Sequence, residues 1–109
     1  MSTPAIGKMR YRLTLQQPAR TPDGGGGASV AWTNVSDLWA ALMPVGGSES
    51  VEADGLKGRT THEIWVRFQA GLGPHMRFIL GARVFDIRSI TDIEEAHRFQ
   101  RCLVEERLP

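Results

Sequence analysis

Apolar and polar residues alternate along several segments of the chain, and this period of two is typical of β-strands with one buried face. The first segment runs from Lys8 to Gln17, and its alternate apolar positions are Met9, Tyr11, Leu13 and Leu15. Pro18 is expected to end this strand. An exposed turn is predicted after it, because Pro22 and Asp23 lead into four consecutive glycines, Gly24 to Gly27.

The second extended stretch has two halves. Residues 28–33 and 35–45 are rich in the aromatic and aliphatic side chains that favour a half-buried pleated surface. The polar break at residues 34–37 indicates a bend or a β-bulge between the halves. Residues 38–42 are apolar and alanine-rich, so a helical turn is the alternative there. We favour a strand.

The clearest strand is predicted over residues 59–69. His62, Ile64, Val66 and Phe68 share one face, and Trp65 lies on the other face among polar residues. A tryptophan on a polar face is unusual and needs a covering partner. Two explanations stay open: Trp65 lies at a contact between subunits, or it covers an open end of the barrel within its own subunit.

Shorter strands are predicted in the last third of the chain. They span residues 76–80, 83–91 and 99–107, with a tight turn at Gly81-Ala82 between the first two. Residues 92–97 are polar and form either a loop or one helical turn. The whole chain, residues 1–109, is therefore expected to be one all-β domain, a small five- to six-stranded barrel or sandwich, with residues 1–7 as a flexible N-terminus.

A long connection separates the second and third predicted strands. Gly46 to Gly58 contains four glycines and few apolar residues, and connections of this length in compact domains are usually functional or disordered. Ser48 or Ser50 could cap a short helical turn over residues 51–53, the only helix expected before residue 90. This connection is the first candidate functional segment.

The composition is typical of a folded domain and argues against several other classes of protein. The chain has 109 residues, 41% hydrophobic and 23% charged, as is usual for a folded domain. No apolar run approaches the roughly 20 residues that span a bilayer, and the N-terminal sequence does not resemble a signal peptide. The net charge of +1 argues against tight binding to phosphates. Cys102 is the single cysteine, and we expect it to be a small buried apolar residue.

Motifs for catalysis or metal binding are missing. His62, His75 and His97 lie on different predicted elements without the spacing of metal ligands. The glycine run lacks the Gly-Lys-Ser/Thr ending of a phosphate loop, and the acidic residues near position 92 lie in a solvated loop rather than as a pair in a cleft. We therefore expect neither an enzyme nor a cofactor or metal site.

Arginine outnumbers lysine, 11 to 2, which favours the fixed, planar pairing found at protein–protein interfaces. Acidic residues interleave with these arginines, so an extended nucleic-acid-binding face is not favoured. A monomeric nucleic-acid-binding barrel stays as an alternative. The residues predicted to lie at subunit contacts are Trp65, Arg67, Arg59 and Arg77.

The order of segments from about residue 7 to 106 resembles the phage head–tail joining, or head-closure, family. The matching segments are Gly7–Arg10, Asp23-Gly24, Trp32, Leu38–Pro44, Gly47–Glu49, Thr61–Phe68, Gly71–Phe78 and Gly81–Asp92, with Cys102 and Glu105 near the end. The family often has a proline after the aspartate that corresponds to Asp92 and leucines near Phe99, and this chain differs there.

The resemblance implies a virion protein assembled in the bacterial host cytoplasm. It would form a homo-oligomeric ring of about six or twelve copies, with the portal–adaptor complex on the head side and the tail-terminator or tail tube on the tail side. Double-stranded DNA would pass through the ring without specific binding, and no membrane is involved. A tail-terminator is the alternative neck component.

In relatives, the long loop between the second and third strands projects toward the central channel. By this resemblance, the candidate gating residues here are Gly46, Gly47, Ser48, Glu49, Glu52, Asp54, Lys57 and Gly58. Their acidic excess would repel phosphate and so let DNA slide past.

Overall fold

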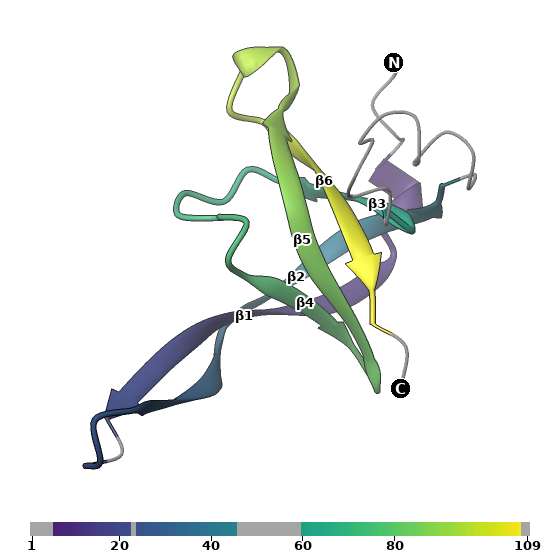
Figure 1. The fold of residues 1–109 in the computed structure, drawn as a ribbon. Helices are drawn as coiled ribbons and strands as arrows, with labels where there is room; N and C mark the ends of the chain where they lie inside the picture. Colours follow the sequence, from purple (N-terminus) through teal and green to yellow (C-terminus); the bar gives the residue numbers. More distant parts are fainter. Residues whose placement is uncertain (1–5, 23, 46–59, 108–109) are drawn as a thin grey trace.

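Six antiparallel strands form one closed barrel (Figure 1). The computed structural model describes residues 6–22, 24–45 and 60–107. The strands are β1 (Tyr11–Pro22), β2 (Ala28–Pro44), β3 (His62–Arg67), β4 (Arg77–Leu80), β5 (Arg83–Asp92) and β6 (Phe99–Glu106), and two 3-10 turns are η1 (Ile6–Lys8) and η2 (Ile93–Glu95). The all-β prediction is confirmed. Within the described ranges, no helix is long and apolar enough to cross a membrane.

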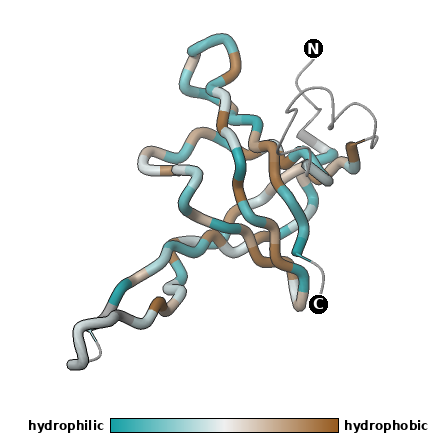
Figure 2. The backbone as a smooth tube through the Cα atoms, viewed as in Figure 1, coloured by the Kyte–Doolittle hydropathy of each residue, from teal (hydrophilic) through white to brown (hydrophobic). Residues whose placement is uncertain are grey.

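The barrel interior is a continuous apolar core. Going around the barrel, the strand order is β1-β2-β3-β6-β5-β4, and β1 pairs with β4 to close it. Alternate residues of each strand point inward, which is why hydrophobic positions recur along the barrel strands in Figure 2. The core residues are Leu13, Leu15, Leu38, Ala40, Ile64, Val66, Met76, Phe78, Phe85, Ile87, Cys102 and Val104.

Cys102 lies within this core, as predicted. It is completely buried, and burial raises the pKa of its thiol to about 12. The side chain therefore stays protonated at neutral pH and serves as a small apolar residue.

The first two strands continue beyond the barrel as a two-stranded arm, residues 17–33, which projects away from it in Figure 1. The prediction that Pro18 ends the first strand is wrong, because Pro18 pairs with Trp32 in the arm. Beyond Gln16, β1 has no partner on its second edge. A proline, which has no N–H, is tolerated on such an edge.

The predicted bulge in the second strand is confirmed. Leu15 pairs with Ser36 and Gln16 pairs with Asn34, so Val35 is an extra residue in β2. A bulge bends its strand and increases the twist, and this one lies where the arm leaves the barrel. Residues 38–42 continue β2 as a strand, so the helical alternative is excluded.

The turns after β4 and β5 lie where the sequence predicted them. Gly81 and Ala82 form the two-residue connection between β4 and β5, and Gly81 has a φ of 60° that favours glycine. Residues 93–95 form a short 3-10 turn, but Glu94 and Glu95 have left-handed backbone angles (φ 57° and 53°), so the segment is closer to the predicted loop than to a regular helical turn. The segment η1 over Ile6–Lys8 was not expected. It precedes the first strand, which begins at Tyr11 rather than Lys8.

Candidate functional site

Trp65 lies on the outer wall of β3 and is buried within its own subunit. Only 1% of its surface is exposed, and it forms a second apolar cluster with Met9 and Ala41. Its indole N–H donates to Glu63 Oε1 at 3.0 Å. Trp65 is therefore covered by residues of its own subunit on the outer wall, not at an open end of the barrel. Its burial favours an intrasubunit role, and the predicted subunit contact at Trp65 stays a prediction.

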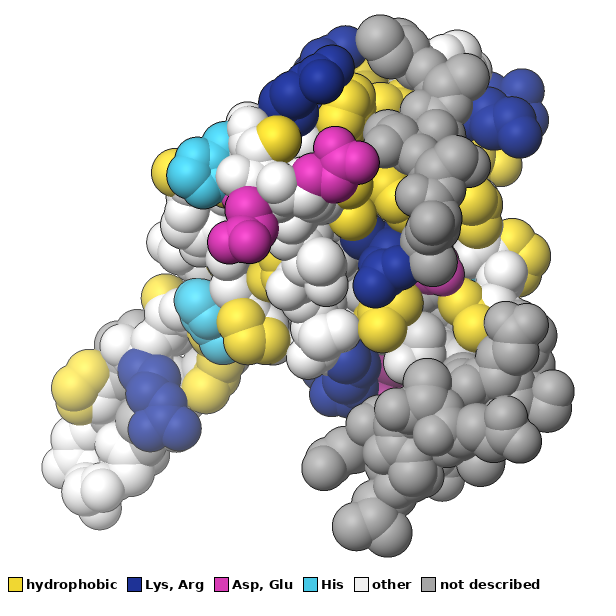
Figure 3. Space-filling view, turned by 90° about the horizontal axis from the view of Figure 1, so that it is seen from above, with side chains coloured by type: hydrophobic (Ala, Val, Ile, Leu, Met, Phe, Trp, Pro, Cys, Tyr) yellow, Lys and Arg dark blue, Asp and Glu magenta, His cyan; other side chains and the backbone are white. Residues whose placement is uncertain are grey.

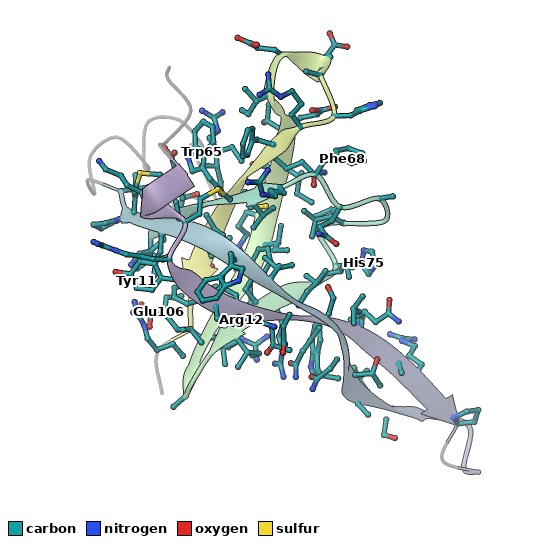
Figure 4. The ribbon with its side chains drawn as sticks, turned by 180° about the vertical axis from the view of Figure 1, so that it is seen from behind. Tyr11, Arg12, Trp65, Phe68, His75 and Glu106 are labelled. Atoms are coloured by element: carbon teal, nitrogen blue, oxygen red, sulfur yellow. The ribbon has the colours of Figure 1, made fainter. Side chains whose placement is uncertain are left out.

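The exposed tryptophan on the barrel is Trp39, on the outer wall of β2, with 52% of its surface exposed. Its strand partner is Arg12, which projects from β1 as labelled in Figure 4. The Arg12 guanidinium carbon lies 5.3 Å from the centroid of the Trp39 ring. Stacking of this kind holds a cation and an aromatic ring in a fixed arrangement.

Trp39 also lines an open hollow of about 430 Å³, together with Gly7, Met9, Arg10 and Arg67. We call Arg10, Arg12, Trp39 and Arg67 the Trp39 face. It contains Arg67, one of the four residues that the sequence predicted at subunit contacts. The Arg67 side chain is exposed and lies over Phe99, 5.7 Å from the ring centroid.

Charge is distributed unevenly between the walls of the barrel. On β5 and β6, arginines are neutralised within the subunit: Arg83 pairs with Glu106 at 2.8 Å, and Arg88 pairs with Glu105. A side-chain hydrogen bond raises the pKa of Arg83 and lowers the pKa of Glu106. By contrast, the three arginines of the Trp39 face form no ion pair with any residue that the structure describes.

Basic and hydrophobic side chains also lie side by side elsewhere on the molecular surface. In Figure 3, Lys and Arg side chains lie next to hydrophobic ones on the body of the barrel, and the arm extends to one side. Tryptophan and arginine are the residue types that contribute most often to the energy of protein–protein contacts. The outer wall therefore has the composition of a protein-binding surface.

Arg77, also predicted at a subunit contact, is used inside the subunit at the base of the arm. Its guanidinium carbon lies 4.1 Å from the Trp32 ring centroid, and its Nε donates to Gln16 Oε1 at 2.8 Å. Gln16 Nε2 in turn donates to Asn34 Oδ1 at 2.8 Å. Desolvation, followed by the nearby Arg107, lowers the pKa of Arg77. These contacts fix the direction in which the arm leaves the barrel.

The predicted gating segment, Gly46 to Gly58, and the predicted contact residue Arg59 lie outside the described residues. The ends of this connection are nevertheless defined. The Val45 N–H donates to the Thr61 carbonyl at 2.9 Å, so the connection leaves and rejoins the barrel at one point. That point is at the end of β2 opposite the arm.

The histidines occupy three separate places. His62 on β3 packs edge-on against Phe85, with ring centroids 5.3 Å apart, and burial lowers its pKa. His97 lies 3.2 Å from Asp92, and His75 lies in the turn before β4. The residues that the structure describes include no group of three or more His, Cys, Asp or Glu side chains arranged to hold a metal ion.

Sequence reasoning missed Trp39 and the arm. The signal for Trp39 was present, because a period of two that turns Leu38 and Ala40 inward turns Trp39 outward. The arm was not predicted, because Pro18 was expected to end the first strand. Taken together, the chain is a small closed barrel with an exposed Trp–Arg wall and a projecting arm, features that suit a subunit with protein partners.

Comparison with known proteins identifies the family. The family model for phage head completion proteins matches residues 4–107, and the chain belongs to this family. It is therefore a structural virion protein that assembles with other head and tail proteins. No curated protein matches the chain.

Two of the solved structures that match the chain illustrate its fold. One is the solution structure of protein SF1141 from Shigella flexneri 2a, with 27% sequence identity and a TM-score of 0.72 over 93% of this chain and 95% of that one. The other is a chain in the virion of a native gene transfer agent particle, with 26% identity and a TM-score of 0.67 over 92% of this chain and 96% of that one. The likeness therefore extends over nearly the whole of each chain.

The two tryptophans of the barrel wall should respond oppositely to truncation. Trp65→Ala should lower the free energy of unfolding of the purified subunit by about 3–5 kcal/mol, because it removes a buried aromatic ring. Trp39→Ala should cost at most about 1 kcal/mol, since the ring is half exposed. Urea unfolding followed by circular dichroism measures both. Equal losses for the two variants would contradict the assignment of Trp39 to a contact surface.

Replacing Arg77 should loosen the arm and leave the barrel intact. Arg77→Met keeps an apolar stem but loses the stacking on Trp32 and the hydrogen bond to Gln16, together about 1–3 kcal/mol. Amide hydrogen exchange in residues 17–33 should become about tenfold faster or more, while exchange in β3 stays unchanged. Arg88→Met is the matched control. Unchanged exchange in the arm would show that other contacts hold it.

Proposed function

We propose that the chain is a ring-forming head-closure subunit of the neck, placed between the portal–adaptor complex and the tail. The observation that carries this proposal is the match of residues 4–107 to the phage head completion family. The likeness to a chain in a gene transfer agent virion supports it. In this role the ring retains packaged DNA and lets it pass during ejection.

The surfaces of the barrel suit a subunit with several neighbours. A ring subunit must meet its two ring neighbours through two different surfaces, because the contact is head-to-tail. The Trp39 face supplies one exposed surface on the wall formed by β1, β2 and β3. The arm projects in another direction and ends in exposed turn residues, so it can reach a component above or below the ring.

The connection after β2 is proposed as the part that faces the channel. It leaves the barrel at Val45 and returns at Thr61, at the opposite end of β2 from the arm. Its sequence has three acidic residues, Glu49, Glu52 and Asp54, against the single Lys57. An acidic segment repels phosphates, so it can obstruct the channel without holding the DNA.

Complementation of particles that lack this gene tests the proposal. Loss of the gene should give heads that lose their DNA and tails that remain unattached, and the full chain should restore both. Deletion of residues 48–57 should restore tail attachment but leave the particles leaking DNA. The packaged genome is measured by nuclease protection and tail attachment by electron microscopy.

Other results of the complementation experiment would favour a tail-terminator or a nucleic-acid-binding barrel. Tails of irregular length on heads that keep their DNA would indicate a tail-terminator. Complete, infectious particles without the gene, together with salt-dependent DNA binding by the purified chain, would favour a nucleic-acid-binding barrel. Normal genome retention with residues 48–57 deleted would show that this segment does not gate the channel.

A further inference from the structure

The turn between β5 and β6 carries two exposed carboxylates, Glu94 and Glu95. Glu94, Glu95 and His97 have φ values of 57°, 53° and 55°, a left-handed conformation that costs a non-glycine residue free energy. All three side chains are exposed. The turn projects at one end of the barrel, as the loop at the top of Figure 1 shows.

Contacts on both sides of the turn hold this conformation in place. The His97 N–H donates to Asp92 Oδ1 at 3.1 Å, and His97 Nε2 lies 3.2 Å from Asp92 Oδ2. Ile93 packs against the outer apolar cluster that contains Trp65. Backbone strain of this kind persists only where surrounding contacts enforce it, and it is concentrated at functional sites.

The charge of this turn is not used within the subunit. Glu94 and Glu95 form no ion pair with any residue of the described ranges, whereas Glu105 and Glu106 are both paired with arginines. Two exposed carboxylates without an ion pair among the described residues can meet a positively charged surface of another copy.

A matching surface lies elsewhere on the same chain. Arg10, Arg12 and Arg67 are also without ion pairs among the described residues, and they surround Trp39 and the hollow beside it. In the strand order, β2 and β5 are three strands apart in a barrel of six. The strand β5 therefore lies on the wall opposite Trp39, whereas the turn after it packs against the outer cluster that contains Met9, one of the residues lining the hollow. The acidic turn and the Trp39 face are two different surfaces of one subunit.

We propose that the acidic turn of one copy docks on the Trp39 face of the next copy, with Glu94 and Glu95 against Arg10, Arg12 and Arg67. This inference rests on the proposed ring and specifies its subunit contact. The two surfaces are different, so the contact is head-to-tail, and a head-to-tail contact can repeat around a closed ring. Trp39 provides the apolar anchor, and the carboxylates select the orientation.

A second copy fits this surface better than DNA does. The chain as a whole has a net charge of only +1, whereas a surface that grips phosphates usually belongs to a clearly basic domain. A ring that binds DNA tightly would also hinder its passage. The complementary carboxylates are present on the chain itself.

Charge reversal of each side, alone and together, tests the contact. The variants are Arg10→Glu with Arg12→Glu, Glu94→Arg with Glu95→Arg, and all four changes combined, which restores the wild-type net charge. Each is supplied to particles that lack the gene. The amount of the chain in purified particles is measured by quantitative mass spectrometry against the major capsid protein, and the melting temperature of each purified subunit checks its folding.

Each one-sided reversal should lower incorporation by about tenfold or more, because like charges then face each other. The combined variant should return to within about threefold of wild type. If a double reversal lowers the melting temperature, the single changes Arg12→Glu and Glu95→Arg replace it, with the same expected pattern.

The results separate this contact from the proposed function. Normal incorporation of either one-sided reversal, or a folded combined variant that stays excluded, would overturn the contact and leave the proposed ring intact. Reversals at the Trp39 face that change only DNA retention would overturn it too, in favour of a DNA-facing surface. Absence of the wild-type chain from purified particles would overturn both.

Discussion

The structure depends on the short pairing between β1 and β4, because it turns a six-stranded sheet into a closed barrel. Three residue pairs make this contact, from Thr14 to Gln16 on β1. The same place carries the bulge at Val35, where β1 and β2 shift register. Gln16 also links Arg77 to Asn34 through its side chain. Closure of the barrel and departure of the arm are therefore fixed by one set of residues.

Each strand then serves two purposes through its two faces. The inward residues fill a single apolar core, which stabilises the subunit without help from a partner. The outward charged residues differ from wall to wall. On β5 and β6, Arg83 and Arg88 are paired with glutamates, whereas the arginines around Trp39 form no ion pair with the residues that the structure describes. In the proposed ring, this division would let the outer wall bind neighbours without weakening the core.

The sequence predicted the fold well and the contact surface only in part. Alternation identified the strands and the bulge, since a period of two directly reports which face is buried. The cover of Trp65 was not foreseen, because Met9 and Ile93 come from segments distant in sequence. The partners of Arg77 within the subunit, Trp32 and Gln16, were not foreseen either, because they meet it only once the barrel closes. Tertiary packing of this kind leaves no local pattern, whereas the outward position of Trp39 does.

Electron cryomicroscopy of the neck of purified particles tests the central claim most directly. The account predicts a ring of copies of this chain at the junction of head and tail, with Trp39 buried against the neighbouring copy and the arm contacting the next component along the axis. A neck without this chain, or a ring in which Trp39 and its surrounding arginines face solvent, would contradict it.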